Sequence, residues 1–276
     1  TRYGALGTMA IGEGGGELAK QLLGKTYDVN MPGVVAVYMT GSPVFGVGPQ
    51  DVALAIIKEV FDNGYVKNKV MEFVGPGIKN LSADFRIGID VMTTETTCLS
   101  SIWETDSKIE EFYANHGREG AYKEVKPAGT AYYDGVIEID LSEIRPMIAM
   151  PFHPSCAYTI DEVNGNLMAV LEETEKRAKV SFGDKVNFTL KNKVIDGKLY
   201  CDQGIIAGCA GGSYENICAA ADILKNANTG NDKFTLSVYP ASTPIYMEIM
   251  KNGAAVELIK AGAIVKTAFC GPCFGA

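Results

Sequence analysis

Strand patterns and helix patterns alternate along this chain of 276 residues. Short apolar runs rich in β-branched residues predict strands, and apolar positions three or four residues apart predict helices. We predict strands near 34–39, 70–74, 135–140, 185–190, 202–207, 234–239 and 263–269. We predict helices near 17–23, 52–61, 82–95, 106–115, 165–178, 214–226 and 244–260. This alternation is typical of α/β architecture with largely parallel sheets.

A cluster of prolines interrupts the pattern in the middle of the chain. The strand predicted near 135–140 is followed by three prolines, Pro146, Pro151 and Pro154. Proline has no backbone N–H and cannot continue a regular element. We therefore predict a domain boundary near Arg145, which gives one domain over 1–145 and a second over 146–276.

Composition and charge narrow the classes of partner. Hydrophobic residues make up 47% of the chain and charged residues 21%, as in ordinary globular domains. The formal charge of −8 disfavours a nucleic-acid or anionic-membrane surface, so we expect a small-molecule partner. Apolar runs stay far below the ~20 residues of a membrane-spanning helix. With no initiator Met and no signal-peptide pattern at the N-terminus, we expect a piece of a cytoplasmic protein.

Three of the seven cysteines follow predicted strands. Cys270 and Cys273 come at the end of the strand near 263–269, and Cys209 follows the strand near 202–207. Ser213 then fits the N-cap of the next helix. Ligands bind at the carboxyl edge of open α/β sheets, and a helix N-terminus favours the thiolate that binds metal. We expect these three thiols to meet at one sheet edge.

Other interpretations of the cysteines remain open at this point. Cys270 and Cys273 could be a chance pair or a thioredoxin-like redox pair, although such a pair opens a helix. An odd number of cysteines in a chain of this length favours a reducing compartment over disulfides. We expect the other four to be packed thiols: Cys98, Cys156, Cys201 and Cys218.

Three thiolates without a nearby fourth ligand point to a particular kind of metal site. A structural zinc ion or an electron-transfer cluster normally has every metal position filled by the protein. A cubane iron-sulfur cluster with three cysteine ligands would leave one iron open to a substrate. An open metal position is what Lewis-acid chemistry requires.

Several segments resemble the aconitase family of iron-sulfur hydro-lyases, which includes aconitase and isopropylmalate isomerase. The run Cys-Gly-Pro-Cys at 270–273 is similar to the family's Ala-Cys-Gly-Pro-Cys-Ile-Gly, and Gly-Cys at 208–209 stands where the family has Ser-Cys-Thr-Asn. Further similar segments lie at 3–12, 40–41, 51–54, 91–103 and 136–143. The resemblance therefore covers nearly the whole chain, in the family's order.

The resemblance implies a fold, a cofactor and a reaction. It implies two three-layer α/β/α domains and a 4Fe-4S cluster held by Cys209, Cys270 and Cys273. It implies that Glu95 is the carboxylate that hydrogen-bonds the water or hydroxyl on the open iron. The reaction would be reversible dehydration and rehydration of a hydroxy di- or tricarboxylic acid. Citrate and isocitrate are the expected substrates, with isopropylmalate isomerase or another hydroxy-acid dehydratase as the alternative.

The sequence also departs from the family. The stretch Ala-Gly-Cys-Ala-Gly at 207–211 lacks the hydroxyl and amide groups that flank the family's cysteine, which leaves substrate identity open. His116 fits a helix C-terminus and His153 a loop, so neither is expected to be the general acid. We expect the acid, the base and the carboxylate anchors to come from flanking domains or a partner subunit. The rivals from other classes are an iron-responsive RNA-binding regulator and a zinc or redox module.

Overall fold

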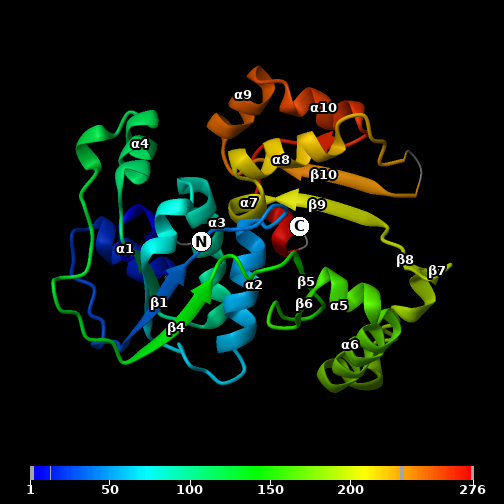
Figure 1. The fold of residues 1–276 in the computed structure, drawn as a ribbon, viewed down its shortest axis with the longest axis horizontal. Helices are drawn as coiled ribbons and strands as arrows, with labels where there is room; N and C mark the ends of the chain where they lie inside the picture. Colours follow the sequence, from blue (N-terminus) through cyan, green and yellow to red (C-terminus); the bar gives the residue numbers. More distant parts are fainter. Residues whose placement is uncertain (1–2, 13, 231–232, 275–276) are drawn as a thin grey trace. The chain divides into compact units, whose positions relative to one another are not determined.

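The computed structural model of the chain describes residues 3–12, 14–230 and 233–274. The chain divides into two compact units, Thr1–Arg145 and Pro146–Ala276. This division falls where the prolines led us to place a boundary, and independent folding of each unit stays a prediction. Both units contain parallel sheets with helices between the strands, so the α/β class is confirmed (Figure 1). In the described part of the chain, no helix is both long and apolar enough to cross a membrane.

The first unit is built around a four-stranded parallel sheet. Its elements are η1 (Gly4–Leu6), α1 (Gly15–Leu22), β1 (Val34–Thr40), α2 (Pro49–Val60), β2 (Val70–Val74), η2 (Pro76–Asn80), α3 (Ala83–Met92), η3 (Thr93–Thr96), β3 (Ser100–Trp103), α4 (Ser107–Asn115), η4 (Glu119–Ala121) and β4 (Gly135–Asp140). The strand order is β3-β2-β1-β4, so the winding direction reverses beside β1. Figure 1 shows α1 and α2 on opposite sides of β1 and β4.

Local sequence signals fix where the helices of this unit begin. Pro49 opens α2, and the Asp51 carboxylate accepts a hydrogen bond from the Gly48 N–H at 2.7 Å. The Ser82 hydroxyl caps α3, and the Asp106 carboxylate caps α4. Each cap satisfies backbone N–H groups that have no partner inside the helix. Alternate residues of β1 are fully buried, and Phe73 stacks on Trp103 with ring centroids 4.0 Å apart.

The second unit contains a three-stranded parallel sheet and two short antiparallel hairpins. Its elements are β5 (Met147–Ala149), β6 (Ala157–Thr159), α5 (Ile160–Gly165), α6 (Leu167–Phe182), η5 (Gly183–Lys185), η6 (Lys191–Lys193), β7 (Val194–Ile195), β8 (Lys198–Leu199), β9 (Gln203–Ala207), α7 (Gly208–Gly211), α8 (Tyr214–Leu224), β10 (Thr235–Tyr239), α9 (Thr243–Lys251), α10 (Ala254–Lys260), β11 (Ile264–Val265) and η7 (Gly271–Phe274). The parallel sheet has the order β11-β10-β9.

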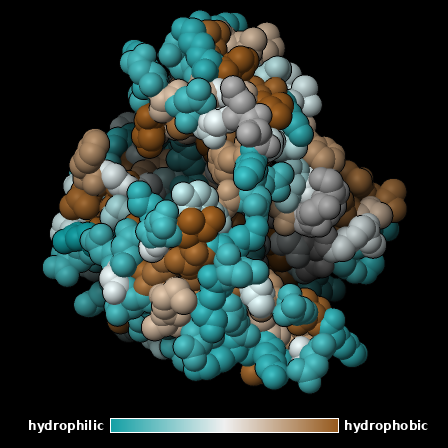
Figure 2. Space-filling view, turned by 90° about the vertical axis from the view of Figure 1, so that its right-hand side faces the viewer, coloured by the Kyte–Doolittle hydropathy of each residue, from teal (hydrophilic) through white to brown (hydrophobic). Residues whose placement is uncertain are grey.

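The core of the second unit lies between this sheet and its helices. Ile217 of α8, Ile249 of α9 and Leu258 of α10 are fully buried against Val238 of β10. The opposite face of the sheet leaves Ile205 and Ile264 about half exposed, at 45% and 48%. On the face drawn in Figure 2, hydrophobic residues are interspersed with hydrophilic ones.

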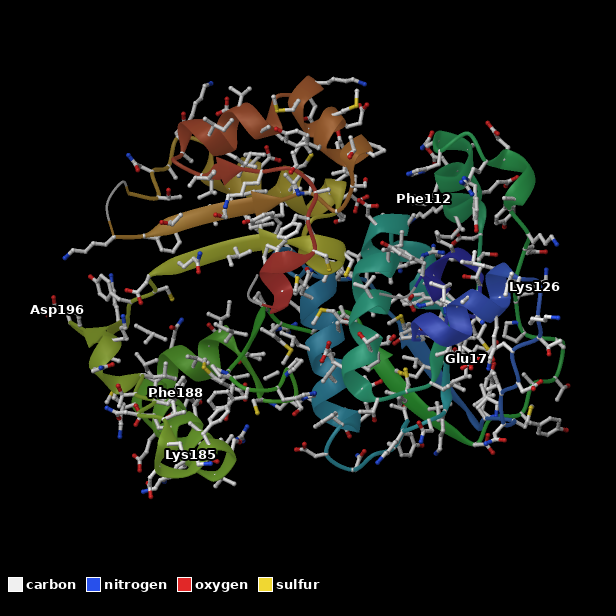
Figure 3. All side chains as sticks on the ribbon, turned by 180° about the vertical axis from the view of Figure 1, so that it is seen from behind. Glu17, Phe112, Lys126, Lys185, Phe188 and Asp196 are labelled. Carbon is white, nitrogen blue, oxygen red and sulfur yellow. The ribbon has the colours of Figure 1, made fainter. Side chains whose placement is uncertain are left out.

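Two predicted strands are wrong or shorter than expected. No strand forms near 185–190, because the backbone N–H groups of Leu190 and Lys191 donate to the Glu175 carboxylate instead of to a neighbouring strand. Phe188 in this segment packs against Phe152, with ring centroids 5.1 Å apart (Figure 3). The strand predicted near 263–269 is only Ile264–Val265.

Two further differences concern element boundaries. The helix predicted near 244–260 is two helices, because Gly253 has a φ of +88° and interrupts the helical backbone between α9 and α10. The four-residue strand β3 was not predicted, although it completes the edge of the first sheet. Its run Ser-Ser-Ile-Trp carries only two apolar residues, too few for a periodic signal.

Candidate metal centre

Cys209 lies in a short segment that leaves the carboxyl end of β9. Gly208 has a φ of +67°, a conformation that glycine adopts without strain. A Cβ atom at this position would lie 3.3 Å from the Cys273 Sγ, so the sulfur of Cys273 packs against the residue next to Cys209. The Cys273 thiol and the segment that carries Cys209 are therefore close together.

The local form of the Cys209 segment differs from the expectation. Cys209 sits inside the one-turn helix α7, not directly ahead of α8. The N-cap prediction is confirmed, because the Ser213 hydroxyl accepts a hydrogen bond from the Asn216 N–H at 3.4 Å and α8 begins at Tyr214.

Cys270 and Cys273 lie at the C-terminal side of β11 and in η7. The last ladder hydrogen bond runs from the Lys266 N–H to the Val238 carbonyl at 2.8 Å. Beyond it the chain leaves the sheet and turns into η7, which contacts β9. Figure 1 shows η7 beside the end of β9, on the side away from α8, α9 and α10. The sheet thus brings Cys273 back to the Cys209 segment.

Electrostatics also couples the three thiols. Burial, followed by the negative charges of the Cys209 and Cys270 thiolates, raises the pKa of the Cys273 thiol. Cys209 is half-buried, whereas Cys270 and Cys273 are exposed. A positively charged group nearby would favour the ionised form of the Cys273 thiol.

The donor set does not fit a single metal ion. Among residues 3–12, 14–230 and 233–274, no three His, Cys, Asp or Glu side chains converge closely enough to hold one ion. A single zinc ion needs its sulfur ligands at ~2.3 Å from one point. An iron-sulfur cluster instead binds each cysteine through a different iron, so it accepts thiols that are farther apart. The iron-sulfur cluster expected from the sequence therefore stays a prediction.

The remaining cysteines have other surroundings. Cys98 is buried and its thiol donates to the Thr93 carbonyl at 3.4 Å. Cys156 contacts the Arg177 guanidinium, and Cys218 accepts a hydrogen bond from the Asn252 amide at 3.3 Å. Cys201 is exposed, so the expectation of a packed thiol is wrong at that position. It lies where the short hairpin β7–β8 leads into β9, and no apolar run there signals burial.

The other residues that the sequence analysis names are Glu95, His116 and His153. Glu95 is exposed in η3 of the first unit, so its role toward the cysteines stays a prediction. His116 ends α4 and its Nδ1 donates to the Phe112 carbonyl at 2.7 Å, as a residue at a helix C-terminus does. His153 lies in a loop, where its Nδ1 accepts from the Ser155 N–H at 3.1 Å.

One contact of the Cys209 segment was not predicted. The Asn216 amide on α8 donates a hydrogen bond to the Ala210 carbonyl at 3.1 Å. The sequence gives Asn216 as an ordinary first-turn residue, three positions after the cap. A bond that reaches six residues back depends on how α7 folds against α8, which no local pattern specifies.

Comparison with known proteins gives the family. The family model for aconitases (aconitate hydratase) matches residues 1–276. The chain belongs to the aconitase family. A crystal structure of aconitase X from Thermococcus kodakaraensis in its holo-form is similar to this aconitase-family chain with a TM-score of 0.42 and 13% identity, over 94% of this chain and 51% of that one.

Curated relatives of this aconitase-family chain are dehydratase subunits. The 3-isopropylmalate dehydratase large subunit of Caldicellulosiruptor saccharolyticus is 31% identical over 273 residues, which is 99% of this chain and 56% of that protein. The 2,3-dimethylmalate dehydratase large subunit of Eubacterium barkeri is 30% identical over 274 residues, or 99% of this chain and 57% of that protein. The chain therefore spans about half the length of the curated relatives it matches.

Proposed function

We propose that this chain is the cluster-bearing part of a hydro-lyase that removes water from a hydroxy acid and returns it at the neighbouring carbon. The observation that carries the proposal is the approach of Cys273 to the Cys209 segment, with Cys270 close enough to affect the Cys273 thiol. Family membership supports it, because the matching relatives are named dehydratases.

The substrate we propose is a substituted malate. The sequence analysis favours citrate and isocitrate as substrates, with isopropylmalate isomerase or another hydroxy-acid dehydratase as the alternative. The names of the relatives, 3-isopropylmalate dehydratase and 2,3-dimethylmalate dehydratase, favour that alternative.

Cys209, Cys270 and Cys273 would hold a 4Fe-4S cluster through three thiolates. When bound in this way, the cluster supplies one iron that acts as a Lewis acid toward the hydroxyl and a carboxylate of the substrate. Cys209 lies in α7, Cys273 lies in η7 and Cys270 directly precedes η7, and the exposure of Cys270 and Cys273 leaves both thiols accessible. Glu95 would orient the departing oxygen through a hydrogen bond.

The remaining catalytic groups would come from elsewhere in the complete enzyme. Loss and addition of water need a general acid, a general base and anchors for the carboxylates. Because the relatives are named large subunits, we propose that a further subunit joins this part of the enzyme. A cytoplasmic location stays a prediction.

Anaerobic reconstitution with iron and sulfide tests the cysteine assignment. We expect the reconstituted chain to be brown, with about four irons and four sulfides per chain for a cubane cluster. Each of the variants Cys209→Ala, Cys270→Ala and Cys273→Ala should lose the colour. Cys201→Ala is the matched control, because Cys201 is another exposed thiol of the same unit, and it should keep the colour.

Two results would contradict the proposal. Colour that survives all three single substitutions would show that other residues hold the cluster. One zinc ion per chain in protein purified without oxygen, with no iron and no sulfide, would favour the zinc or redox module instead. The RNA-binding alternative is tested by a salt-dependent gel shift of the metal-free chain, which we expect to show no specific complex at a net charge of −8.

A further inference from the structure

The segment that carries Cys209 has few means of holding its own shape. Helix α7 has four residues, Gly208–Gly211, which make a single turn. Isolated helices much longer than this are marginal in water, so a single turn depends on outside contacts. Its residues apart from Cys209 are two glycines and an alanine, which have no polar side chain to form such contacts.

Backbone hydrogen bonds hold the two ends of the segment. The Gly212 N–H donates to the Gly208 carbonyl at 2.8 Å and closes the turn. The Ala241 N–H then donates to the Gly212 carbonyl at 2.8 Å, which ties the end of the turn to the loop after β10. The packing there is tight, because a Cβ atom on Gly212 would lie 2.4 Å from the Tyr239 carbonyl oxygen.

A side chain from α8 holds the middle of the segment. The Asn216 Nδ2 donates at 3.1 Å to the Ala210 carbonyl, which belongs to the Ala210–Gly211 peptide group, one residue beyond Cys209. Asn216 itself is fixed in the first turn of α8, where its N–H donates to the Ser213 hydroxyl. Ser213 is only 6% exposed, so this anchor has little freedom to move. The contact therefore joins the Cys209 segment to a firmly capped helix.

We infer that Asn216 is a positioning residue for Cys209. By fixing the Ala210 carbonyl, its amide restrains the Ala210–Gly211 peptide plane and so limits how far the single turn that carries the Cys209 thiol can open. The inference rests on the proposed function only in taking Cys209 to be a cluster ligand. The hydrogen bond from Asn216 to the Ala210 carbonyl does not depend on a bound cluster.

Two variants of Asn216 separate the hydrogen bond from the volume of the side chain. Asn216→Asp keeps the shape but replaces the N–H donor with a carboxylate oxygen, which repels the Ala210 carbonyl. Asn216→Gln keeps the amide on a longer side chain and should retain part of the hydrogen bonding to the Ala210 carbonyl. Asn252→Asp is the matched control, because the Asn252 amide in the same unit donates to the Tyr214 hydroxyl at 2.8 Å and to the Cys218 thiol.

The test measures alkylation rates of single cysteines by mass spectrometry in the reduced, metal-free 276-residue chain. A lost hydrogen bond of the usual net strength corresponds to about a 2- to 10-fold rise in segment opening. We expect the alkylation rate of Cys209 to rise by that factor in Asn216→Asp, less in Asn216→Gln, and not in Asn252→Asp. Cys218 should respond in the opposite way, faster in Asn252→Asp and unchanged in Asn216→Asp.

Iron release adds a second readout on the loaded protein. After anaerobic reconstitution, we expect Asn216→Asp to release iron to a chelator faster than the wild type. A wild-type alkylation rate of Cys209 in Asn216→Asp would overturn the inference. So would an equal rise at Cys201 and Cys218, because it would show general loosening of the unit. If the wild type forms no cluster, the proposed function fails, while the alkylation rates still decide the role of Asn216.

Discussion

At the scale of single residues, the first unit buries a charged pair that no sequence pattern predicted. The Arg86 side chain is fully buried, and its Nη2 donates to the Asp106 carboxylate at 2.6 Å and to the Ile78 carbonyl at 3.0 Å. Burial raises the pKa of Asp106, but the hydrogen bond and positive charge of Arg86 outweigh it and hold the pKa below its usual range. One side chain of α3 thus fixes η2 and the start of α4.

Removing Arg86 should destabilise the unit strongly. Arg86→Leu leaves the Asp106 carboxylate partly buried without its cation, and we expect the free energy of unfolding to fall by about 3–5 kcal/mol in urea titrations. Lys126→Leu is the control, because Lys126 pairs with Glu124 on the exposed surface (Figure 3) and such pairs contribute about 0–1 kcal/mol. A loss below about 1 kcal/mol in Arg86→Leu would contradict the assigned role.

The same pair should appear in the pH dependence of stability. The folded-state pKa of Asp106 is lower than its unfolded value, so its contribution is present above the unfolded pKa of about 3.9 and is lost as the pH falls through the folded-state pKa. Titrating the unfolding free energy downward from pH 5 should therefore show a smaller loss in Arg86→Leu than in the wild type.

Glu95 is a residue whose substitution should leave the fold intact. Its side chain is exposed, while the hydroxyls of Thr93 and Thr96 on either side hold η3 by donating to backbone carbonyls at 2.7 Å. In the complete enzyme, we expect Glu95→Gln to keep the cluster and to lower turnover by about 10- to 100-fold. Steady-state kinetics beside an absorbance spectrum of the cluster would measure both. Unchanged turnover would remove Glu95 from the site.

At the scale of elements, the sequence predicts best the strands with a dense or alternating apolar pattern. The strands near 34–39, 70–74 and 234–239 were predicted within a residue because apolar residues dominate the first two and alternate with polar residues along the third. The run near 263–269 looks equally apolar, yet β10 ends at Tyr239 and offers no ladder partner beyond Lys266. The length of β11 therefore depends on how many hydrogen-bonding partners β10 offers. A run of residue types does not encode those partners.

The candidate site, too, could be predicted from the sequence only in part. Strand ends and the family resemblance predict that Cys209, Cys270 and Cys273 meet, and the structure places Cys273 beside the segment that carries Cys209. Their local setting could not be predicted, because it depends on the left-handed backbone of Gly208, the close packing at Gly212 and the reach of Asn216 across to Ala210. These are contacts between segments that only the folded unit brings together.

At the scale of the whole molecule, several histidine and arginine side chains of the described residues make contacts within their own segments. His116 and His153 make local contacts, and the Arg145 guanidinium donates to the Ser142 and Ile144 carbonyls. Arg177 contacts Glu173 and Cys156. These groups are engaged in holding their own segments, so we expect the carboxylate anchors and the acid and base to come from other parts of the enzyme.

The 276-residue chain alone should therefore be nearly silent in catalysis even when it carries a cluster. General acid–base groups typically contribute 10²- to 10⁴-fold, so we expect the reconstituted chain to dehydrate isopropylmalate or dimethylmalate at least about 100-fold more slowly than the enzyme with all its parts. Adding the rest of the enzyme in trans should restore turnover and leave the colour unchanged. If the chain alone turns over substrate as fast as the complete enzyme, the acid, the base and the carboxylate anchors must lie within these 276 residues. Local contacts such as those of His153 and Arg145 would then have to break when the substrate binds.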